Sequence, residues 1–319
     1  MGQLQGTDSA YTAALEAAAY YVTPQPGSLR FKGETRREYL QRQTTNNLDL
    51  LNPQRALPSL LTAANGRILE YFTLLDDGDS IGMLTQPRHG PGLATYFQKR
   101  IFFNDKVSVE NLRAQQSQIE IHGSQAADLL LKFGFRPPEL DEVIDQQWES
   151  CRIRAIGEQG FGPDLKFRVL LPAAAVGQFT DELAGLFIPA LQHATREVLR
   201  IEAGLAGDPE FNNVYTPFEV GLARLVSADK GCYTGQEVLA RQVTYDKIVR
   251  QLVRIQAIAS LERGADIFAE GKVVGKLSSV AHSPRLGAIG LAVIRRPCDE
   301  IGTTLEVHQP AGIITARVI

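Results

Sequence analysis

The sequence predicts an α+β protein that ends in a small β domain. Its 319 residues, taken at roughly 150 residues per domain, correspond to about two domains. Helical and strand patterns alternate up to about residue 243, and short runs rich in Val and Ile, separated by glycine turns, follow. The hydrophobic share of 44% and the charged share of 22% are typical of an ordinary globular protein. This composition argues against the disordered and membrane-embedded classes.

The first part of the chain shows two α/β segments of similar type, with no fixed-period repeat. In the first segment we expect helices over 11–21 and 93–102, and strands over 67–75 and 80–85 that are joined by a turn at Asp76-Asp77-Gly78-Asp79. In the second we expect strands over 118–122, 151–156 and 166–171, and helices over 124–133, 180–186 and 195–203. Gly134 and Gly204 are expected to end two of these helices.

The last part of the chain predicts about six short strands. They are expected over 249–258, 265–268, 272–277, 287–293, 305–308 and 312–318. Several short strands at such spacing are typical of a small barrel or sandwich. We therefore expect a C-terminal β domain.

Charge and cysteine content limit the partners of the chain. Lys and Arg total 33 against 36 for Asp and Glu, so we expect no direct binding to nucleic acid. The apolar stretch 10–22 is interrupted by Glu16 and preceded by no basic residue, which fits neither a signal peptide nor a spanning helix. Three widely separated cysteines favour a reducing compartment and argue against a cysteine-rich metal cage. We expect a cytoplasmic protein without a membrane partner.

Three capping boxes predict helix starts. They are Thr35 with Glu38, Thr216 with Glu219, and Thr234 with Glu237. In such a box the Thr hydroxyl accepts from a backbone N–H three residues on, and the Glu side chain accepts from the N–H of the Thr. Pro217 would strengthen the second start, because the first helical position needs no N–H.

The third helix start gives a meaning to Cys232. This cysteine lies in a turn next to Gly231, before the predicted helix and two residues after Lys230. The positive end of a helix dipole and a nearby ammonium both favour a thiolate, so Cys232 is the best candidate nucleophile. The alternative, a small buried hydrophobic side chain, stays open.

The other cysteines and the histidines give weaker signals. Cys151 lies in a predicted strand and Cys298 precedes an acidic pair, which disfavours a thiolate, so both are expected to be structural. The histidines, at 89, 122, 193, 282 and 308, lack the spacing of metal ligands, and we predict no metal site. The stretch Gly160-Phe161-Gly162 lacks the third glycine of a dinucleotide-binding loop.

Arg196 and Arg200 lie one turn apart in a predicted helix. Two guanidinium groups on one side suit a carboxylate or phosphate ligand. The alternative is a pair of surface salt bridges with Glu197 and Glu202, and both interpretations remain open.

Residues 230–237, followed by Ala240-Arg241, resemble the signature of the YgfZ branch of the aminomethyltransferase-like folate-binding superfamily. The resemblance covers most of the chain. Further segments similar to the superfamily's motifs are 33–46, 64–69, 200–204, 216–222 and 274–277. It implies two intertwined ferredoxin-like α/β units that form a central channel, followed by a small antiparallel β-barrel. The expected domains are 1–115, 116–242 with the cysteine loop, and 243–319.

The resemblance also implies tetrahydrofolate, or a derivative, as the cofactor. Asp164 occupies the place of the carboxylate that grips the pterin, and Arg196 that of an arginine that meets the glutamate tail. A carboxylate suits the pterin because its two oxygens accept from a ring N–H and the exocyclic amine together. Asn46 and Tyr71 are the other expected cofactor contacts.

For the cysteine loop, the resemblance makes Cys232 and Lys230 the expected catalytic pair. Residues that would support the loop are Gly231, Tyr233, Thr234, Gly235, Gln236, Glu237 and Arg241. One departure bears on the reaction: the glycine-cleavage enzyme carries an Asp pair where this chain has Glu70 and Tyr71. The cysteine loop of this chain is not a feature of the glycine-cleavage enzymes, which favours the YgfZ branch.

The leading hypothesis is therefore a folate-binding accessory protein that supports the assembly or repair of iron-sulfur proteins, and through them tRNA modification. Expected partners are folate and iron-sulfur proteins, and we expect a monomer. One alternative is a folate-dependent one-carbon (aminomethyl) transferase. A second is a folate-sensing regulatory module without turnover, so whether the chain is an enzyme stays open.

Overall fold

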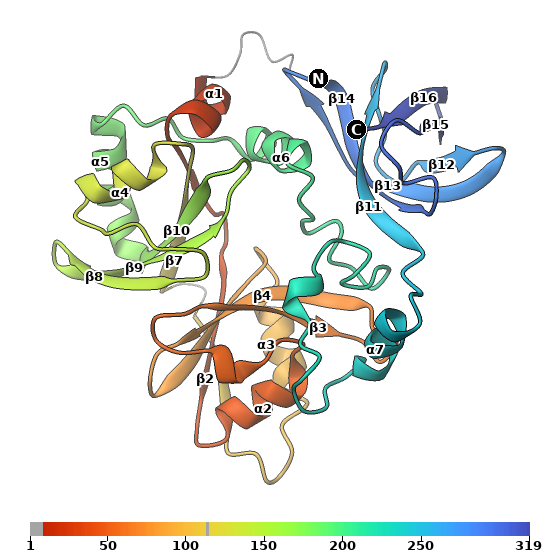
Figure 1. Cartoon of the computed structure of the whole chain (residues 1–319). Helices are drawn as coiled ribbons and strands as arrows, with labels where there is room; N and C mark the ends of the chain where they lie inside the picture. The colour runs from red at the N-terminus through yellow and green to blue at the C-terminus, as the bar shows by residue number, and fades with distance from the viewer. Residues whose placement is uncertain (1–8, 113–114) are drawn as a thin grey trace. The chain divides into compact units, whose positions relative to one another are not determined.

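The computed structural model describes residues 9–112 and 115–319 (Figure 1). Its contacts divide the chain into two compact units. Unit 1 holds the described residues up to Leu61, together with Glu70–His193 and Asp229–Tyr233; unit 2 holds Thr62–Leu69, Ala194–Ala228 and Thr234–Ile319.

Unit 1 contains two five-stranded sheets whose described strand pairs are antiparallel. The first sheet has the order β3-β4-β5-β2-β6 and the second β1-β7-β10-β9-β8. The strands of the first are β2 (Gly27–Lys32), β3 (Leu57–Thr62), β4 (Ile68–Asp76), β5 (Ser80–Thr85) and β6 (Ser108–Asn111). Those of the second are β1 (Ala19–Val22), β7 (Gln116–His122), β8 (Val143–Trp148), β9 (Cys151–Gln159) and β10 (Leu165–Pro172).

The two sheets share one plan, and β1 joins them. In the first sheet the chain runs β2, helix, β3, β4, β5, helix, β6; in the second it runs β7, helix, β8, β9, β10, helix. The edge position that β6 takes beside β2 is filled beside β7 by β1, with Ala19 opposite His122 and Val22 opposite Ile119. A strand from the start of the chain thus completes the second sheet, which is the intertwining that the resemblance implied.

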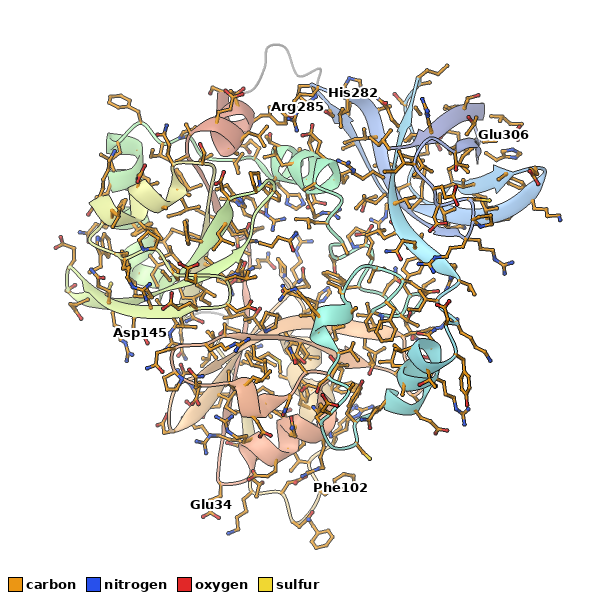
Figure 2. All side chains as sticks on the ribbon, viewed as in Figure 1. Glu34, Phe102, Asp145, His282, Arg285 and Glu306 are labelled. Atoms are coloured by element: carbon orange, nitrogen blue, oxygen red, sulfur yellow. The ribbon has the colours of Figure 1, made fainter. Side chains whose placement is uncertain are left out.

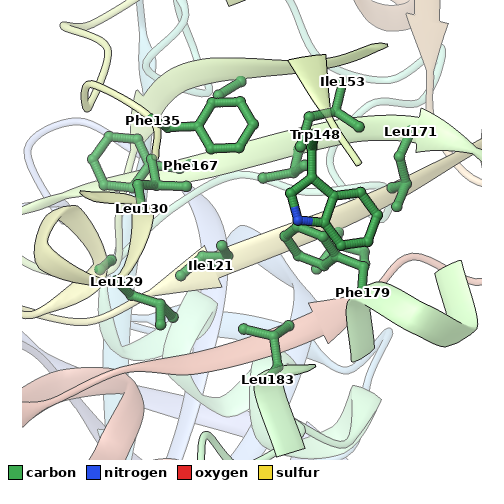
Figure 3. Close-up of a cluster of buried hydrophobic side chains, with 14 of the residues drawn as sticks. Ile121, Leu129, Leu130, Phe135, Trp148, Ile153, Phe167, Leu171, Phe179 and Leu183 are labelled. Atoms are coloured by element: carbon green, nitrogen blue, oxygen red, sulfur yellow. The ribbon is translucent and has the colours of Figure 1, made fainter. Parts of the chain in front are cut away.

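Helices cover each sheet and close its core. The helices are α1 (Ser9–Glu16), α2 (Arg36–Gln43), α3 (Gly90–Gln98), α4 (Ala126–Lys132) and α5 (Val176–Gly185), with 3-10 turns at Leu48–Leu50 and Ala173–Ala175. Under α2 and α3, the rings of Phe31 and Phe97 meet edge to face at 5.1 Å. Under α4 and α5, Phe179 packs against Trp148 in the cluster drawn in Figure 3. Burial of such side chains is the main favourable term in folding.

Unit 2 combines two helices with a closed barrel. The helices are α6 (His193–Glu202) and α7 (Gln236–Thr244), with a 3-10 turn at Ala223–Leu225 between them. The barrel has the order β11-β14-β13-β12-β15-β16. Its strands are β11 (Arg250–Ala257), β12 (Asp266–Ala269), β13 (Lys272–Ser283), β14 (Gly287–Arg295), β15 (Thr304–Gln309) and β16 (Gly312–Val318). The predicted α+β class and the six barrel strands are confirmed.

Two kinds of sequence prediction differ from the structure: the end of one predicted helix, and the capping boxes. The helix predicted over 11–21 ends at Glu16, and its last residues belong to β1. The predicted helix start at Thr35 is confirmed, since Thr35 is the N-cap of α2, but its side chain makes no cap, and its Oγ1 instead accepts from the N–H of Lys106. No helix follows Thr216, where Glu219 accepts the N–H of Thr216 within a turn.

Among the described residues, no helix is both long and apolar enough to cross a membrane.

Candidate functional site

Cys232 is the exposed cysteine of the three. Cys151 is half-buried and packs on the core under α4 and α5, and Cys298 is half-buried against the barrel core. The structural role predicted for these two is thus confirmed by their packing. Reagents reach an exposed thiol first, so Cys232 is the most accessible nucleophile among the three.

Lys230 points inward, away from the solvent that Cys232 faces. Its side chain is only 8% exposed, and its Nζ donates to the carbonyl oxygens of Thr44 at 2.7 Å and Asn46 at 2.8 Å. Burial lowers the pKa of Lys230 from 10.5 to about 8, and the charge of Asp49 opposes this shift only in part. The ammonium therefore fastens the cysteine loop to the segment after α2.

Tyr233 is the second buried side chain of the loop. The Lys230 Nζ lies 5.3 Å from the centre of its ring, within cation–π range. Burial raises the pKa of Tyr233 to about 12, so its hydroxyl is neutral near pH 7. Lys230 and Tyr233 thus anchor the loop on both sides of Cys232, while Gly231 and Cys232 stay exposed.

In unit 2, the chain after the loop packs on the hairpin between β3 and β4. The Thr62 hydroxyl donates to the carbonyl of Thr234 at 2.6 Å. Gly235 has φ of 86°, and a Cβ there would lie 2.4 Å from the carbonyl oxygen of Ala63. Only glycine fits such a close, left-handed position.

Helix α7 begins at Gln236, so the predicted capping by Thr234 does not occur. Glu237 and Arg241 form an exposed ion pair at 2.6 Å across one helical turn. Exposed pairs of this kind contribute little to stability. Glu237 and Arg241 therefore lie within α7, and among the residues predicted to support the loop Gly235 carries the strict steric requirement.

The segment that receives Lys230 contains Asn46. Its Nδ2 donates to the carbonyl of Pro58 at 2.8 Å, and its Oδ1 accepts from the N–H of Asn47 at 2.9 Å. Thr45 is buried, and its Oγ1 accepts from the N–H of Leu60. Both groups of the Asn46 amide thus help to shape the loop, and one hydrogen and one lone pair remain for a ligand.

Glu70 and Tyr71 follow each other on β4. The buried Glu70 places Oε2 at 2.7 Å from Nδ1 of His89, and its Oε1 accepts from the N–H of Tyr71. His89 stands directly before α3, after Arg88 with φ of 70°. Sequence reasoning missed this carboxylate–imidazole pair, because nothing local links residues 70 and 89.

A cluster of charged side chains lies on one face of the second sheet, and sequence reasoning missed it as well. Lys166 Nζ contacts Glu120 at 3.0 Å and Glu158 at 3.1 Å. Arg168 contacts Glu158 through Nε at 2.9 Å, and His122 contacts Glu120 at 3.1 Å. Alternation of charged and apolar residues along β7 and β10 was the available signal.

The charges in this cluster hold one another ionised. Burial raises the pKa of Glu158, but the charges of Arg168 and Lys166 outweigh it, and the pKa lies below its ordinary value. For Arg168, burial lowers the pKa, and the two glutamates more than reverse that effect. The cluster is therefore a paired, balanced network.

Asp164 lies in the hairpin between β9 and β10. Its carboxylate is exposed and makes no hydrogen bond or ion pair with other described residues. In the same hairpin, the ring of Phe161 stacks on His122 at 4.5 Å with an angle of 4°. A Cβ at Gly160 would lie 2.2 Å from the carbonyl oxygen of Asp164, so this turn requires glycine.

The two arginines of α6, in unit 2, have different surroundings. Arg200 is buried and bonds Glu197, Glu210 and the Ser279 hydroxyl. Arg196 is better exposed and lies 3.4 Å from Glu197. Both guanidinium groups contact Glu197, so they lie on one side as predicted, and the salt-bridge alternative holds for Glu197. The donors of Arg200 are used in a buried network and are not left for a ligand. Glu202 pairs with Arg285.

Unit 1 also contains a cavity of about 540 Å³ between its two sheets. Its walls include Arg154, which pairs with Asp77 at 2.7 Å and Asp145 at 2.9 Å. No residue predicted for the site lines it. No group of three or more His, Cys, Asp or Glu side chains among the described residues could hold a metal ion.

The predicted residues are thus brought together only in part. Lys230 meets Asn46, with Cys232 two residues on. Asp164 and Arg196, the two predicted folate contacts with charged side chains, belong to different units.

Comparison with known proteins agrees with this fold. A solved structure of the glycine cleavage system aminomethyltransferase T from Bartonella henselae matches with a TM-score of 0.84. The match covers 97% of this chain and 87% of that one, at 18% identity. The chain has the fold of an aminomethyltransferase. Residues 250–319, which form the barrel, also match the family model of the glycine cleavage T-protein C-terminal barrel domain.

Relatives of this aminomethyltransferase-like chain extend over most of its length. A chloroplastic protein of Arabidopsis thaliana named "Putative transferase" is 28% identical over 92% of this chain and 68% of its own. The aminomethyltransferase of Oceanobacillus iheyensis is 26% identical over 92% of this chain and 83% of its own. The aminomethyltransferase of Bacillus subtilis is 24% identical over 99% of this chain and 90% of its own. Together the matches support the aminomethyltransferase-like superfamily.

Proposed function

We propose that this chain is a folate-binding accessory protein of the YgfZ type that supports the assembly or repair of iron-sulfur proteins. The observation that carries the proposal is the exposed Cys232 between two buried anchors, Lys230 and Tyr233. A side chain that only filled space would be buried. In this loop the neighbours Lys230 and Tyr233 are buried, and the Cys232 thiol is exposed to solvent.

The chemistry of a single thiol narrows the role. A conventional iron-sulfur cluster needs about four ligands, and Cys232 supplies one. The described residues offer no further group of metal ligands. Cys232 therefore acts on a partner, or contributes one ligand to a site that the partner completes.

Folate is the proposed cofactor, and the exposed side chains fit it in part. In unit 1, Asp164 offers two acceptor oxygens that no described residue engages, which suits the paired N–H groups of a pterin. Tyr71 is half-buried on β4, and Asn46 retains limited hydrogen-bonding capacity. In unit 2, Arg196 would meet a carboxylate of the glutamate tail. When bound, folate would carry a one-carbon group.

The test of the thiol uses a strain that lacks the protein. Cys232→Ser should fail to restore the activity of iron-sulfur enzymes, whereas Cys298→Ser, at the half-buried barrel cysteine, should restore it. Full restoration by Cys232→Ser would remove the thiol from the proposal.

The test of the cofactor is calorimetry with tetrahydrofolate. Wild-type protein should bind it, and Asp164→Ala and Arg196→Ala should each weaken binding by about tenfold, the loss of one charge-assisted hydrogen bond. Wild-type protein that binds no folate would contradict this part of the proposal.

A second candidate function is a folate-dependent aminomethyl transferase, favoured by the names and extent of the relatives. Formation of methylenetetrahydrofolate from an aminomethyl donor would establish it. Glu70 and Tyr71 stand where the glycine-cleavage enzyme has its Asp pair, so we expect no such product.

The remaining expectations stand as proposals. They are division of the chain at 115/116 and 242/243, a monomer, and a cytoplasmic location without direct nucleic-acid contact.

A further inference from the structure

Two phenylalanines stand in the solvent at the loop that follows α3. Phe102 is 64% exposed and Phe103 is fully exposed. Figure 2 labels Phe102 at the lower edge of the view, on the loop after α3. A side chain that stays in water on folding contributes almost nothing to the hydrophobic stabilisation of its own chain. Exposed aromatic rings that stand singly, such as Phe187, are normal, whereas two adjacent exposed rings are candidates for contact with a partner.

The loop that carries them is held in one conformation. The Asp105 carboxylate, with 3% of its side chain exposed, accepts from the N–H of Phe102 at 3.0 Å and from Arg42 at 2.6 Å. The N–H of Asp105 in turn donates to the carbonyl of Phe102. Burial raises the pKa of Asp105, but these two hydrogen bonds outweigh it and keep the pKa below its usual value. A loop ordered in advance loses less entropy when it binds.

The charge around the rings is positive. Lys99 and Arg100 are exposed just before them, and the Arg100 guanidinium lies 3.4 Å from the centre of the Tyr96 ring. Lys106, beyond the turn, is neutralised by Glu34 at 2.6 Å. Aromatic rings next to an arginine are the composition of binding hot spots, and two positive charges favour a partner rimmed by carboxylates.

The same turn of α2 holds both this loop and the cysteine loop. Arg42, in the last turn of α2, binds Asp105, and Thr44, two residues later, accepts from Lys230. Cys232 follows Lys230 by two residues. Both loops belong to unit 1, so the exposed rings and the exposed thiol are fixed to one short segment of one compact body.

We propose that the loop 99–106 is the docking surface for an acidic protein partner whose iron-sulfur site is brought to Cys232. The two phenylalanine rings enter an apolar recess of the partner, and Lys99 and Arg100 meet carboxylates at its rim. This inference rests on the proposed function, since it names the kind of surface that the partner offers to the thiol. A protein is favoured over a lipid surface because the loop is tied to the segment that fixes the thiol.

The test compares three variants in the strain that lacks the protein. Phe102→Ser/Phe103→Ser should lower the restored iron-sulfur enzyme activity by about tenfold or more, the usual cost of removing a hot spot. Lys99→Glu/Arg100→Glu should lower it as well. Phe187→Ser, at a ring that is 92% exposed after α5, is the matched control and should restore activity fully.

The outcomes separate docking from chemistry. If Cys232→Ser fails to restore activity while the double serine variant succeeds, the docking surface is wrong and the thiol's role stands. If Cys232→Ser restores activity, the thiol is removed from the proposed function, and the docking proposal, which brings the partner to Cys232, falls with it. The purified double variant should keep the circular dichroism and the tetrahydrofolate affinity of the wild type, which excludes misfolding.

Two further measurements test other occupants. Wild-type protein that sediments with phosphatidylglycerol vesicles, where the double serine variant does not, would show that a lipid surface covers the loop. A dimer seen by light scattering and lost in that variant would show that a second copy covers it. Either result would overturn the proposal.

Discussion

The Lys230 ammonium donates a 2.7 Å hydrogen bond to the carbonyl oxygen of Thr44. A second bond, to the carbonyl of Asn46, fixes the same nitrogen. A lysine two residues before a reactive cysteine would ordinarily be taken as the cation that stabilises its thiolate. The hydrogen bonds occupy this ammonium on the segment after α2, so Lys230 fixes the position of the cysteine loop.

The burial of Lys230 predicts a pH dependence of stability. Its pKa is about 8 in the folded protein against 10.5 for the ordinary side chain, so between these values the unfolded chain holds more protons. The free energy of unfolding should therefore rise with pH in this window, by at most about 3 kcal/mol. Lys230→Met abolishes this gain, so the stability of wild type relative to the variant should increase from pH 8 to pH 10.5.

Urea unfolding of both proteins at three pH values across the window measures the effect. Lys276→Met, at an exposed lysine of the barrel, is the control, and its difference from wild type should stay constant. A flat difference for Lys230→Met would contradict the buried, charged environment assigned here.

Exposure predicts the order in which the thiols react. Iodoacetamide at pH 8 should alkylate Cys232 at least about tenfold faster than Cys151 or Cys298, because only the former is exposed and the others pack on cores. Mass spectrometry of peptides at successive times gives the three rates. Equal rates, with the fold intact, would show that the loop does not present Cys232 as described.

Gly235 predicts a steric cost that glycine alone avoids. Gly235→Ala must place a Cβ 2.4 Å from the Ala63 carbonyl oxygen at a positive φ, and should lose about 2–4 kcal/mol of unfolding free energy. Gly221, also at positive φ but with no atom within 4 Å of such a Cβ, is the matched control. Gly221→Ala should lose only about 1 kcal/mol. Similar losses in the two variants, measured by urea unfolding, would rule out the clash.

Local patterns predicted the barrel and failed where distant residues decide. Each barrel strand contains Val or Ile, and glycine turns separate several of them, so all six were found. The residues 19–22 form a strand only because β7, far along the chain, pairs with them. The Thr216 box formed only in part: Glu219 accepts the Thr216 N–H as predicted, but its other oxygen binds Arg250, and the residues form a turn instead of a helix.

The candidate site divides in the same way. The place of Cys232 in a glycine turn before a helix was predictable from its neighbours, while its exposure was left open against burial and is given by the structure. The partners of Lys230 and the pair of Glu70 with His89 were not, because each depends on backbone or side chains brought close by the sheet. Chemistry carried by one segment can be predicted from sequence, whereas chemistry assembled from several needs the fold.

The paired charges on the second sheet predict a loss of stability in acid. The pKa of Glu158 lies below its ordinary value of 4.5, so its stabilising charge is fully present above that pH and is lost as the pH falls through the folded value. Glu158→Gln leaves Lys166 and Arg168 buried with one partner fewer, and should cost about 3–5 kcal/mol at pH 7. The deficit should narrow below about pH 4, where wild type also becomes protonated.

Thermal unfolding of wild type and Glu158→Gln from pH 7 to pH 3 measures this deficit. Glu306→Gln, at an exposed pair with His308, is the control. A deficit that is the same at pH 3 and pH 7 would mean that Glu158 stabilises the sheet by packing rather than by charge.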